Sequence, residues 1–325
     1  MPVWHEATAK WVKEGRLAVV GVTQEQHADR GRLFAQWKRF DWPILNDPIN
    51  LLESKAVPIF AAIDEHGIVR QVGPKLDRFE KEFLEEKFDD DAPPQSAPTS
   101  KPELRELRTQ AEADDTADAW MRYGDALALW GGESRTRDAI QAYEHAVKVE
   151  PKNGLAHFRL GVCYRRRFES GSRQPGDFQK AVDAWGRALE LDPNQYIWRR
   201  RIQQYGPRLD KPYSFYDWVS QAVTDIKARG ERPIELAVVP QAAELAAPIR
   251  AFAEDTASAK SPDADGRINR DSKGLIDVEV TVVPSRVAPG QSVQIHMQFR
   301  PSAGKVHWNN EADPLRLWVN APDGW

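Results

Sequence analysis

The chain contains a single cysteine, Cys163, so any thiol chemistry rests on one side chain. Thiol–disulfide exchange needs an attacking thiolate and, as a rule, a second thiol that resolves the mixed disulfide. The sequence offers no second thiol, and therefore no Cys-x-x-Cys pair. Cys163 stands close to Gly161 in a stretch with helical periodicity, which favours an inert buried thiol over a reactive one. We therefore expect no catalytic residue and no intrachain disulfide in the chain as written.

The other polar residues form no arrangement typical of a metal, phosphate or acyl-transfer site. The seven histidines are scattered, without the spacing that binds zinc. Glycine-rich phosphate loops and the Gly-x-Ser-x-Gly nucleophile motif do not occur. Asp64, Glu65 and His66 are adjacent, but adjacent side chains on a tight turn diverge, so we expect a solvated turn rather than an acid–base set. No metal and no other cofactor is expected.

Composition limits the class of protein. The 325 residues are 41% hydrophobic and 29% charged, which is enough for two or three packed domains in a soluble protein. A net charge of -4 gives no general attraction to nucleic acid or anionic lipid, so neither is an expected partner. No apolar run approaches the roughly 20 residues of a membrane span, and a signal peptide pattern is missing. The compartment stays unknown; we expect a location outside the cytoplasm if a segment upstream of Met1 is missing.

Two changes in composition divide the chain. Residues 89–102 combine an acidic run with Pro, Ser and Thr, which is typical of a linker, and residues 255–273 are rich in Ser, Asp, Ala and Gly. We therefore expect a multidomain protein. Its predicted parts are an incomplete α/β domain over 1–88, a linker over 89–102, an all-α domain over 103–230, a connecting segment over 231–273 and part of a β-sandwich over 274–325.

The first part alternates helical and extended sequence. Apolar residues from Val3 to Trp11 recur at helical spacing, and Gly15 suits the left-handed residue that ends a helix. Gly67 lies between two β-rich runs and supplies the tight turn of a hairpin. The expected elements are helices over 2–14, 27–40 and 79–88 and extended strands over 17–22, 42–45, 59–64 and 68–72.

This order of helix, strand, helix, strand, strand, helix resembles the thioredoxin-like redoxin family, from its first active-site helix onward. The most specific match is Val57-Pro58 before a strand, followed by Asp64-x-x-Gly67 and a second strand. The resemblance implies that Val57 and Pro58 are the remnant of a redox site, with a cis-proline that faces the redox cysteines. Taken alone, Pro58 would be an ordinary loop proline before a strand.

The resemblance also implies that a Cys-x-x-Cys and the first core strand belong just upstream of Met1. Without that strand, the strands over 17–22 and 59–64 lose their shared neighbour, and a row of backbone groups needs other partners. Met1 is then either the true start of a degenerate domain or an internal methionine of a longer protein. The loss of a central strand favours the second alternative.

Two blocks of the middle part superimpose, with aromatic, small and proline residues in the same order. The blocks contain Trp120, Tyr123, Gly124, Leu127, Ala139, Tyr143, Ala146 and Pro151, and then Leu160, Gly161, Tyr164, Ala181, Trp185, Ala188 and Pro193. This pattern resembles the tetratricopeptide repeat, in which small residues lie where two helices cross. A Gly- and Pro-containing stretch over 168–177 separates the helices of the second block. A third first-helix is expected over 196–205, with a helix over 213–229 packed behind it as a cap.

The resemblance implies that the first helices of the repeats line a concave surface that commonly holds a peptide. The expected groove residues are Phe158, Val162, Arg165, Arg200 and Gln204, and the expected partner is a protein or peptide segment. Two alternatives stay open. The repeats could simply join the flanking domains, and the arginine runs at 165–167 and 199–201 could be solvated helix faces.

The last part alternates strictly between apolar and polar residues from Ile276 to Val282 and again from Val293 to Phe299, which predicts half-buried antiparallel strands. Together with residues 307–310 and a strand over 315–319, this part resembles the start of an immunoglobulin-like domain, similar to the N-terminal domain of the membrane thiol–disulfide interchange reductases. It gives about half of the roughly 100 residues that such a sandwich uses.

Two hypotheses about function follow. The first is a non-catalytic protein–protein interaction scaffold, built from a degenerate redoxin domain and tetratricopeptide repeats. The alternative is a fragment of a thiol–disulfide oxidoreductase whose Cys-x-x-Cys lies upstream of the recorded start. Genomic sequence that reads in frame into Trp-Cys-x-x-Cys before the start codon would favour the alternative.

Overall fold

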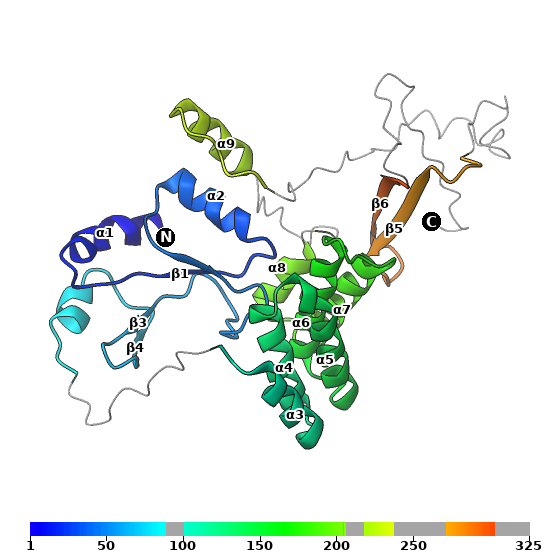
Figure 1. The fold of residues 1–325 in the computed structure, drawn as a ribbon. Helices are drawn as coiled ribbons and strands as arrows, with labels where there is room; N and C mark the ends of the chain where they lie inside the picture. The colour runs from blue at the N-terminus through cyan, green and yellow to red at the C-terminus, as the bar shows by residue number, and fades with distance from the viewer. Residues whose placement is uncertain (89–100, 204, 206–217, 237–270, 303–325) are drawn as a thin grey trace. The chain divides into compact units, whose positions relative to one another are not determined.

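The structure is a computed structural model that describes residues 1–88, 101–203, 205, 218–236 and 271–302. The chain divides into two compact units, one made of Met1–Pro240 with Val282–Gln294 and the other of Gln241–Thr281 with Ile295–Trp325. Figure 1 follows the chain from the blue N-terminal helices to the orange strands near the C-terminus. The elements that build the candidate site all lie in the larger unit.

The first 88 residues alternate short helices and strands. Pro2 begins the first helix, where its missing N–H has no intrahelical partner to lose, and Gly15 follows the helix with φ +71°. The first strand starts at Gly21 rather than at Leu17, because only Gly21–Thr23 pair with a neighbouring strand. The elements are α1 (Pro2–Lys13), β1 (Gly21–Thr23), α2 (Ala28–Lys38), β2 (Ile44–Asn46), β3 (Ala61–Ile63), β4 (Val69–Val72) and the π-helical turn η1 (Glu80–Leu84).

These strands form two separate two-stranded sheets. β1 pairs with β2 in parallel, with Val22 opposite Leu45, and β3 pairs with β4 in an antiparallel hairpin. No described strand joins the two pairs, so the described residues do not form a continuous thioredoxin-like sheet. Val22 in β1 and Ile63 in β3 are 44% and 55% exposed. The Val57–Pro58 peptide bond is cis, the geometry that the redoxin resemblance implies for this position.

Aromatic side chains hold α1 against the hairpin. Trp11 lies in one buried cluster with Phe79 and Phe83, and Trp4 stacks on Phe60 at 4.8 Å between ring centroids. At the rim of this cluster the Glu80 carboxylate accepts hydrogen bonds from Trp11 Nε1 at 2.9 Å, Lys10 Nζ at 3.0 Å and Arg16 Nη1 at 3.1 Å. The Trp11 and Lys10 hydrogen bonds are the main reason that the pKa of Glu80 is lowered to about 2.

Replacing Glu80 with glutamine should remove a pH-dependent part of the stability. The unfolded carboxyl has a pKa of 4.5 and the folded one about 2, so Glu80 stabilises the fold above pH 4.5, and this contribution is lost as the pH falls from 4.5 toward 2. Thermal unfolding followed by tryptophan fluorescence at about pH 7 and about pH 3 measures it. The wild type should lose more stability on acidification than Glu80→Gln, with Glu82→Gln as the control in the same turn. Equal losses in all three proteins would contradict the expectation.

The middle of the chain consists of antiparallel helices that follow one another in pairs. Thr116 and Asn153 cap the first helices of two successive pairs, where their side-chain oxygens accept from Ala119 N at 3.2 Å and Ala156 N at 3.0 Å. The helices are α3 (Leu104–Asp114), α4 (Ala117–Trp130), α5 (Thr136–Val149), α6 (Gly154–Phe168), α7 (Asp177–Leu191) and α8 (Tyr196–Gln203), with a 3₁₀ turn η2 (Glu133–Arg135) before α5.

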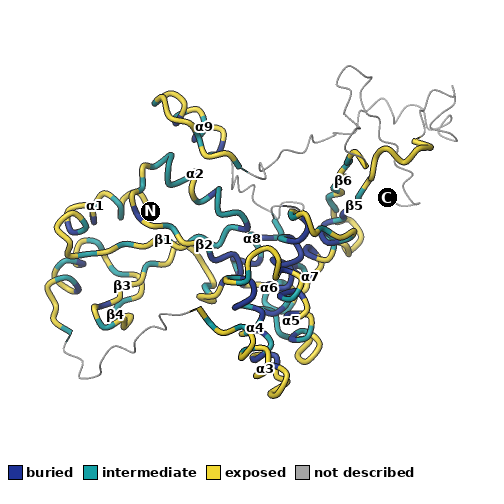
Figure 2. Tube along the Cα trace, viewed as in Figure 1, coloured by how far each residue is buried: buried dark blue, intermediate teal, exposed yellow. Residues whose placement is uncertain are grey.

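Glycines let these helices cross closely, as the repeat pattern predicts. A Cβ atom on Gly124 would lie 2.8 Å from the Tyr143 ring, and one on Gly161 would lie 2.5 Å from the Trp185 ring. Trp185 and Tyr143 are fully buried. Figure 2 shows the result as a dense buried region over α5, α6 and α7. Among the described residues the largest core therefore lies in the helical repeats. One smaller cluster lies within the first 88 residues, and another joins Leu33 of α2 to residues 219–226.

The long stretch between α6 and α7 is a loop, as predicted, and a buried ion pair closes it. Arg167 donates to both carboxylate oxygens of Asp177, from Nη2 at 2.6 Å and from Nε at 3.0 Å. Both residues are buried. Arg167 is therefore not part of a solvated helix face, and that interpretation of the run at 165–167 is wrong for this side chain.

Helix α9 (Trp218–Ala228) does not cap α8. Its apolar side packs on α2, where Leu33 shares a buried cluster with Ala222 and Ile226. Trp37 stacks on Trp218 at 5.9 Å and donates from Nε1 to Asp225 at 2.8 Å. The predicted cap is wrong because α2 offers this helix an aromatic and aliphatic face.

The strands expected near the C-terminus are present, as β5 (Ile276–Val283) and β6 (Gln294–Pro301), which pair with each other. The burial pattern differs from the expectation, since Val278 and Val280 are 55% and 49% exposed whereas Thr281 is buried. A two-stranded sheet provides no second layer to cover the apolar face, so the described residues do not support a sandwich. Residues 307–310 and 315–319 lie outside the described residues, as do most of 89–102 and 255–273.

Candidate peptide-binding groove

The described residues that were predicted to line a groove lie on α6 and α8, and those on α6 are not open to solvent. Phe158 and Val162 on α6 are fully buried, and Arg165 is 5% exposed. Ile49, from the loop after β2, is fully buried in the same hydrophobic cluster. A segment of the same chain therefore covers this face. We call residues 47–55 the docked loop.

Arg159 on α6 holds the backbone of the docked loop. Its Nε donates to the carbonyl oxygen of Ile49 at 3.2 Å and its Nη2 to that of Asn50 at 3.4 Å. Its Nη1 forms an ion pair with Asp125 on α4 at 2.8 Å. The guanidinium thus uses all three nitrogens, and the side chain is only 4% exposed.

Asp125 completes this buried network. Its second carboxylate oxygen accepts from the Tyr143 hydroxyl at 2.7 Å. Burial raises the pKa of Asp125, and the charge of Arg159 opposes that rise. Burial, together with the nearby Asp125 carboxylate, raises the pKa of Tyr143 well above its ordinary value, so Tyr143 keeps its proton and donates. One guanidinium therefore links the loop, α4 and α6.

Arg201 on α8 holds the other side of the docked loop. It donates to the carbonyl oxygen of Pro48 at 3.2 Å, and also to the Gln24 carbonyl oxygen and the Gln26 side chain. Gln26 in turn donates from Nε2 to the carbonyl oxygen of Val162 at 3.2 Å. Arg201 is 2% exposed, so the interpretation of the run at 199–201 as a solvated face is wrong for this residue.

The docked loop is also ordered by its own side chains. Asp47 accepts from the Leu51 backbone N–H at 2.8 Å. Asn50, which is fully buried with φ 53°, accepts from the Ser54 N–H at 3.0 Å and donates to the Ser54 carbonyl oxygen at 3.0 Å. The Lys55 carbonyl oxygen then accepts from the Tyr196 N–H at 3.2 Å, where α8 begins. The loop therefore presents a fixed turn to the helices.

Ion pairs line the edge of the contact. Arg200 on α8 binds Glu25 at 2.8 Å. Arg165 on α6 binds Glu169 at 2.6 Å, and His27 lies 3.2 Å from the same carboxylate. Burial alone would raise the pKa of Glu169, but the hydrogen bond from His27 and the charge of Arg165 outweigh it and lower the pKa.

Of the predicted groove residues, Phe158 and Val162 share a cluster with Ile49 of the docked loop. Arg165 and Arg200 instead form ion pairs, with Glu169 and Glu25. Gln204 lies outside the described residues. Val57 and Pro58 follow the docked loop and are not part of its contact with Arg159 or Arg201. In this structure the residues on α6 and α8 contact a segment of the same chain, the docked loop.

The most extensively bonded residues, Arg159 and Arg201, were not predicted. Arg159 lies one helical turn before Val162 and so shares the face on which groove residues were expected, which is a signal that the sequence contained. Arg201 follows two other arginines, and the sequence alone does not distinguish it from them. The docked loop itself gave no signal, because nothing in its sequence indicates contact with helices more than a hundred residues later.

Other chemistry is not visible in the part of the chain that the structure describes. Cys163 is fully buried in α6, and burial raises the pKa of its thiol to about 11, which makes the thiolate scarce at neutral pH. The described residues contain no group of three His, Cys, Asp or Glu side chains placed to hold a metal ion. Within the same ranges, no helix has the length and apolar character needed to cross a membrane.

Comparison with known protein families supports the prediction of tetratricopeptide repeats in the helical part of the chain. A family model described as a tetratricopeptide repeat matches residues 132–196, which run from the turn before α5 to the start of α8. A comparison with curated proteins gives no match. Tetratricopeptide repeats stack helix pairs and generally mediate protein–protein binding. The helices that hold the docked loop thus include tetratricopeptide repeat sequence.

Proposed function

We propose that this chain is a non-catalytic protein–protein interaction scaffold whose tetratricopeptide repeats hold a protein segment on their inner face. One observation carries the proposal: Ile49 is fully buried in the same cluster as Phe158 and Val162, while arginines from α6 and α8 bond the loop backbone around it. The inner face is therefore able to bind a polypeptide turn. In this proposal the repeats bind the redoxin-like segment, and that segment has a structural role and takes no part in thiol chemistry.

The chemistry of the docked loop indicates which segments the groove accepts. Arg159 and Arg201 bond carbonyl oxygens, which every residue carries, so they provide affinity with little discrimination. Selectivity comes from Ile49, which fills an apolar site, and from Asn50, whose side chain closes the turn. A segment with an aliphatic residue before an asparagine in a tight turn fits this face best.

A peptide added in trans tests whether the inner face is a binding groove. A fluorescein-labelled peptide of residues 45–56 should bind the full chain carrying Ile49→Arg, because the bulky charge keeps the tethered loop from seating. Binding to the wild type should be at least roughly tenfold weaker, since the tethered loop competes at high effective concentration. Fluorescence anisotropy measures both, and circular dichroism verifies that the helices stay folded.

Two further variants complete the test. Leu51→Arg places the same charge in the docked loop at a side chain that is 43% exposed, so Ile49 stays seated and peptide binding should remain at the wild-type level. Adding Arg159→Ala to Ile49→Arg should weaken peptide binding again. If the Ile49→Arg chain is folded and binds the peptide no better than the wild type, the inner face is not a groove and the proposal fails.

A further inference from the structure

Helix α7 holds a second segment of the chain. Residues 282–294 belong to the same compact unit as the helical repeats. Val283, the last residue of β5, is fully buried in the large hydrophobic cluster that also contains Phe178 and Val182 of α7. The repeats therefore bury one aliphatic side chain from this segment, as they bury Ile49 from the docked loop.

Gln179 on α7 bonds both backbone polar groups of Val282. Its Oε1 accepts from the Val282 N–H at 2.9 Å, and its Nε2 donates to the Val282 carbonyl oxygen at 3.2 Å. This pair of bonds needs a donor and an acceptor side by side, which a side-chain amide provides. The Gln179 amide thus bonds the segment as the peptide group of a neighbouring strand would.

Asp183, which lies one turn further along α7, fixes the orientation of that amide. Its Oδ1 accepts from Gln179 Nε2 at 2.9 Å. An ionised carboxylate only accepts hydrogen bonds, so a flipped amide would place its oxygen against another acceptor. Because Gln179 and Asp183 are four residues apart on one helix face, the amide is already oriented by α7 itself.

The residue after Val283 suits a strand that ends at this site. Residues two apart in a strand face the same edge, so Pro284 follows Val282 on the edge that Gln179 bonds. Proline has no N–H, and therefore leaves no donor unpaired beyond that bond. A valine pair followed by a proline thus provides one bonded peptide unit, one buried side chain and a strand end.

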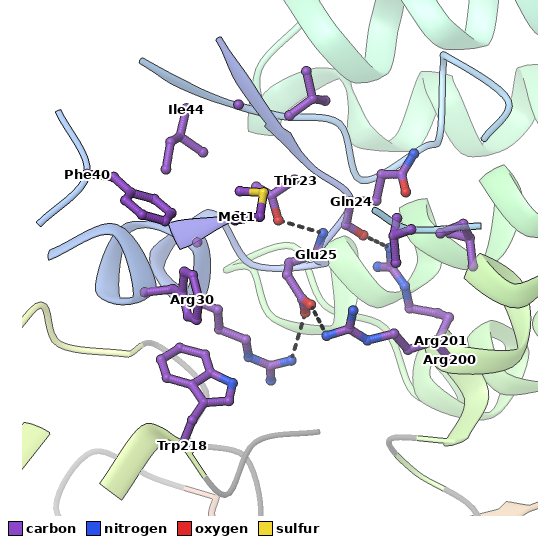
Figure 3. A pocket seen from close by; sticks show the side chains of 16 residues that line it. Met1, Thr23, Gln24, Glu25, Arg30, Phe40, Ile44, Arg200, Arg201 and Trp218 are labelled. Carbon is purple, nitrogen blue, oxygen red and sulfur yellow. Dashed lines mark hydrogen bonds and ion pairs between the residues drawn. The ribbon is translucent and has the colours of Figure 1, made fainter. Parts of the chain in front are cut away.

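We propose that α7 is a second polypeptide-binding site of the repeats, which recognises an extended segment ending in Val-Val-Pro, and that residues 282–284 of the same chain occupy it. Gln179 provides affinity for the backbone, and burial of the first valine before the proline provides selectivity. The docked loop uses other side chains, since Arg200 and Arg201 of α8 contact Glu25 and the Gln24 backbone (Figure 3). Either proposal can therefore fail without the other.

A peptide added in trans tests the site. A fluorescein-labelled peptide of residues 278–287 should bind the full chain carrying Val283→Arg, because the buried charge keeps the tethered segment off α7. Anisotropy should show binding to the wild type that is at least roughly tenfold weaker, since the tethered segment competes. Val287→Arg is the matched control: Val287 is 37% exposed, so Val283 stays seated and binding should remain at the wild-type level.

Changes in the site and in the peptide test the mode of binding. Adding Gln179→Ala to Val283→Arg removes both backbone hydrogen bonds and should weaken peptide binding roughly tenfold. Adding Asp183→Asn instead should change it by less than about twofold, because asparagine still offers an acceptor to Gln179. A peptide with Asp in place of the buried valine should bind at least roughly tenfold more weakly.

Hydrogen exchange of the Val282 amide tests the same contact without a change at Val283, so it decides the question if circular dichroism shows that Val283→Arg is not folded. Gln179→Ala removes the acceptor of this amide and should speed its exchange roughly fivefold. The proposal is overturned if Gln179→Ala leaves the exchange unchanged, or if a folded Val283→Arg chain binds the peptide no better than the wild type. Protection of Val282 that rises with protein concentration would also overturn it, because the occupant would then come from a second copy.

Discussion

Replacing Arg159 with alanine should destabilise the protein by about 3–5 kcal/mol, because it leaves the Asp125 carboxylate buried without its counter-charge. The same change removes the donors to two carbonyl oxygens of the docked loop. Equilibrium unfolding in urea measures the loss. Arg187→Ala is the matched control, since Arg187 forms an exposed ion pair with Glu190 and should change stability by less than about 0.5 kcal/mol.

The size of this loss should depend on pH. The folded pKa of Asp125 is already raised by burial, and removing Arg159 raises it further. A carboxyl with a raised folded pKa stabilises the fold when protonated, and that stabilisation is lost as the pH rises through the folded pKa. The deficit of Arg159→Ala should therefore be smaller at mildly acidic pH than at neutral pH.

A second change should compensate for the first. Asp125→Asn in the Arg159→Ala background removes the buried charge while keeping an acceptor for Tyr143, so it should recover part of the lost stability. An Arg159→Ala protein as stable as the wild type at both pH values would show that the loop contact contributes nothing.

Replacing Gly161 with alanine should destabilise the repeats by about 1–3 kcal/mol, although alanine is the better helix former by about 1 kcal/mol. The new methyl group would lie 2.5 Å from Trp185 and 2.9 Å from the Ala181 carbonyl oxygen, and a buried tryptophan against backbone has little room to move. The thermal midpoint, followed by circular dichroism, should fall.

Gly186 provides the control of opposite sign. It lies in the middle of α7, where the nearest atom to a new Cβ is Ile202 Cδ1 at 3.7 Å. Gly186→Ala should therefore stabilise the protein by about 0.5–1 kcal/mol, through helix propensity alone. If both substitutions shift stability in the same direction, close packing at Gly161 is not what that residue provides.

The repeats could be predicted from the sequence because their signals are local. Gly161 and Trp185 lie in neighbouring helices, and a spacing that repeats along the chain places small residues opposite large ones. The same register predicted Phe158 and Val162 on one face. It could not show what covers that face, because Arg159 meets the Ile49 carbonyl oxygen across 110 positions of sequence. A contact between positions so far apart produces no repeating pattern of residues in the sequence.

The β segments show a different limit. Alternation predicted strands near Ile276 and Gln294, and β-rich runs predicted strands near Gly21 and Ala61; strands are present at each position. Alternation says which side chains share a face, but it does not say whether another layer covers them. Val278 and Val280 follow the pattern and are still exposed. The packing of α9 on α2 could not be predicted either. An apolar helix face shows that the helix packs against something, but not which element it packs against.

The docked loop also has a consequence for synthesis of the chain. Pro48 is synthesised 153 positions before Arg201, which donates a hydrogen bond to its carbonyl oxygen. At roughly 5–20 residues per second, the ribosome needs on the order of ten to thirty seconds to cover that distance. Ile49 has no apolar site to fill until Phe158 and Val162 on α6 have been made. The docked loop therefore cannot complete its contacts until α8 has been synthesised. A chaperone that shields aliphatic residues could bind Ile49 during this time.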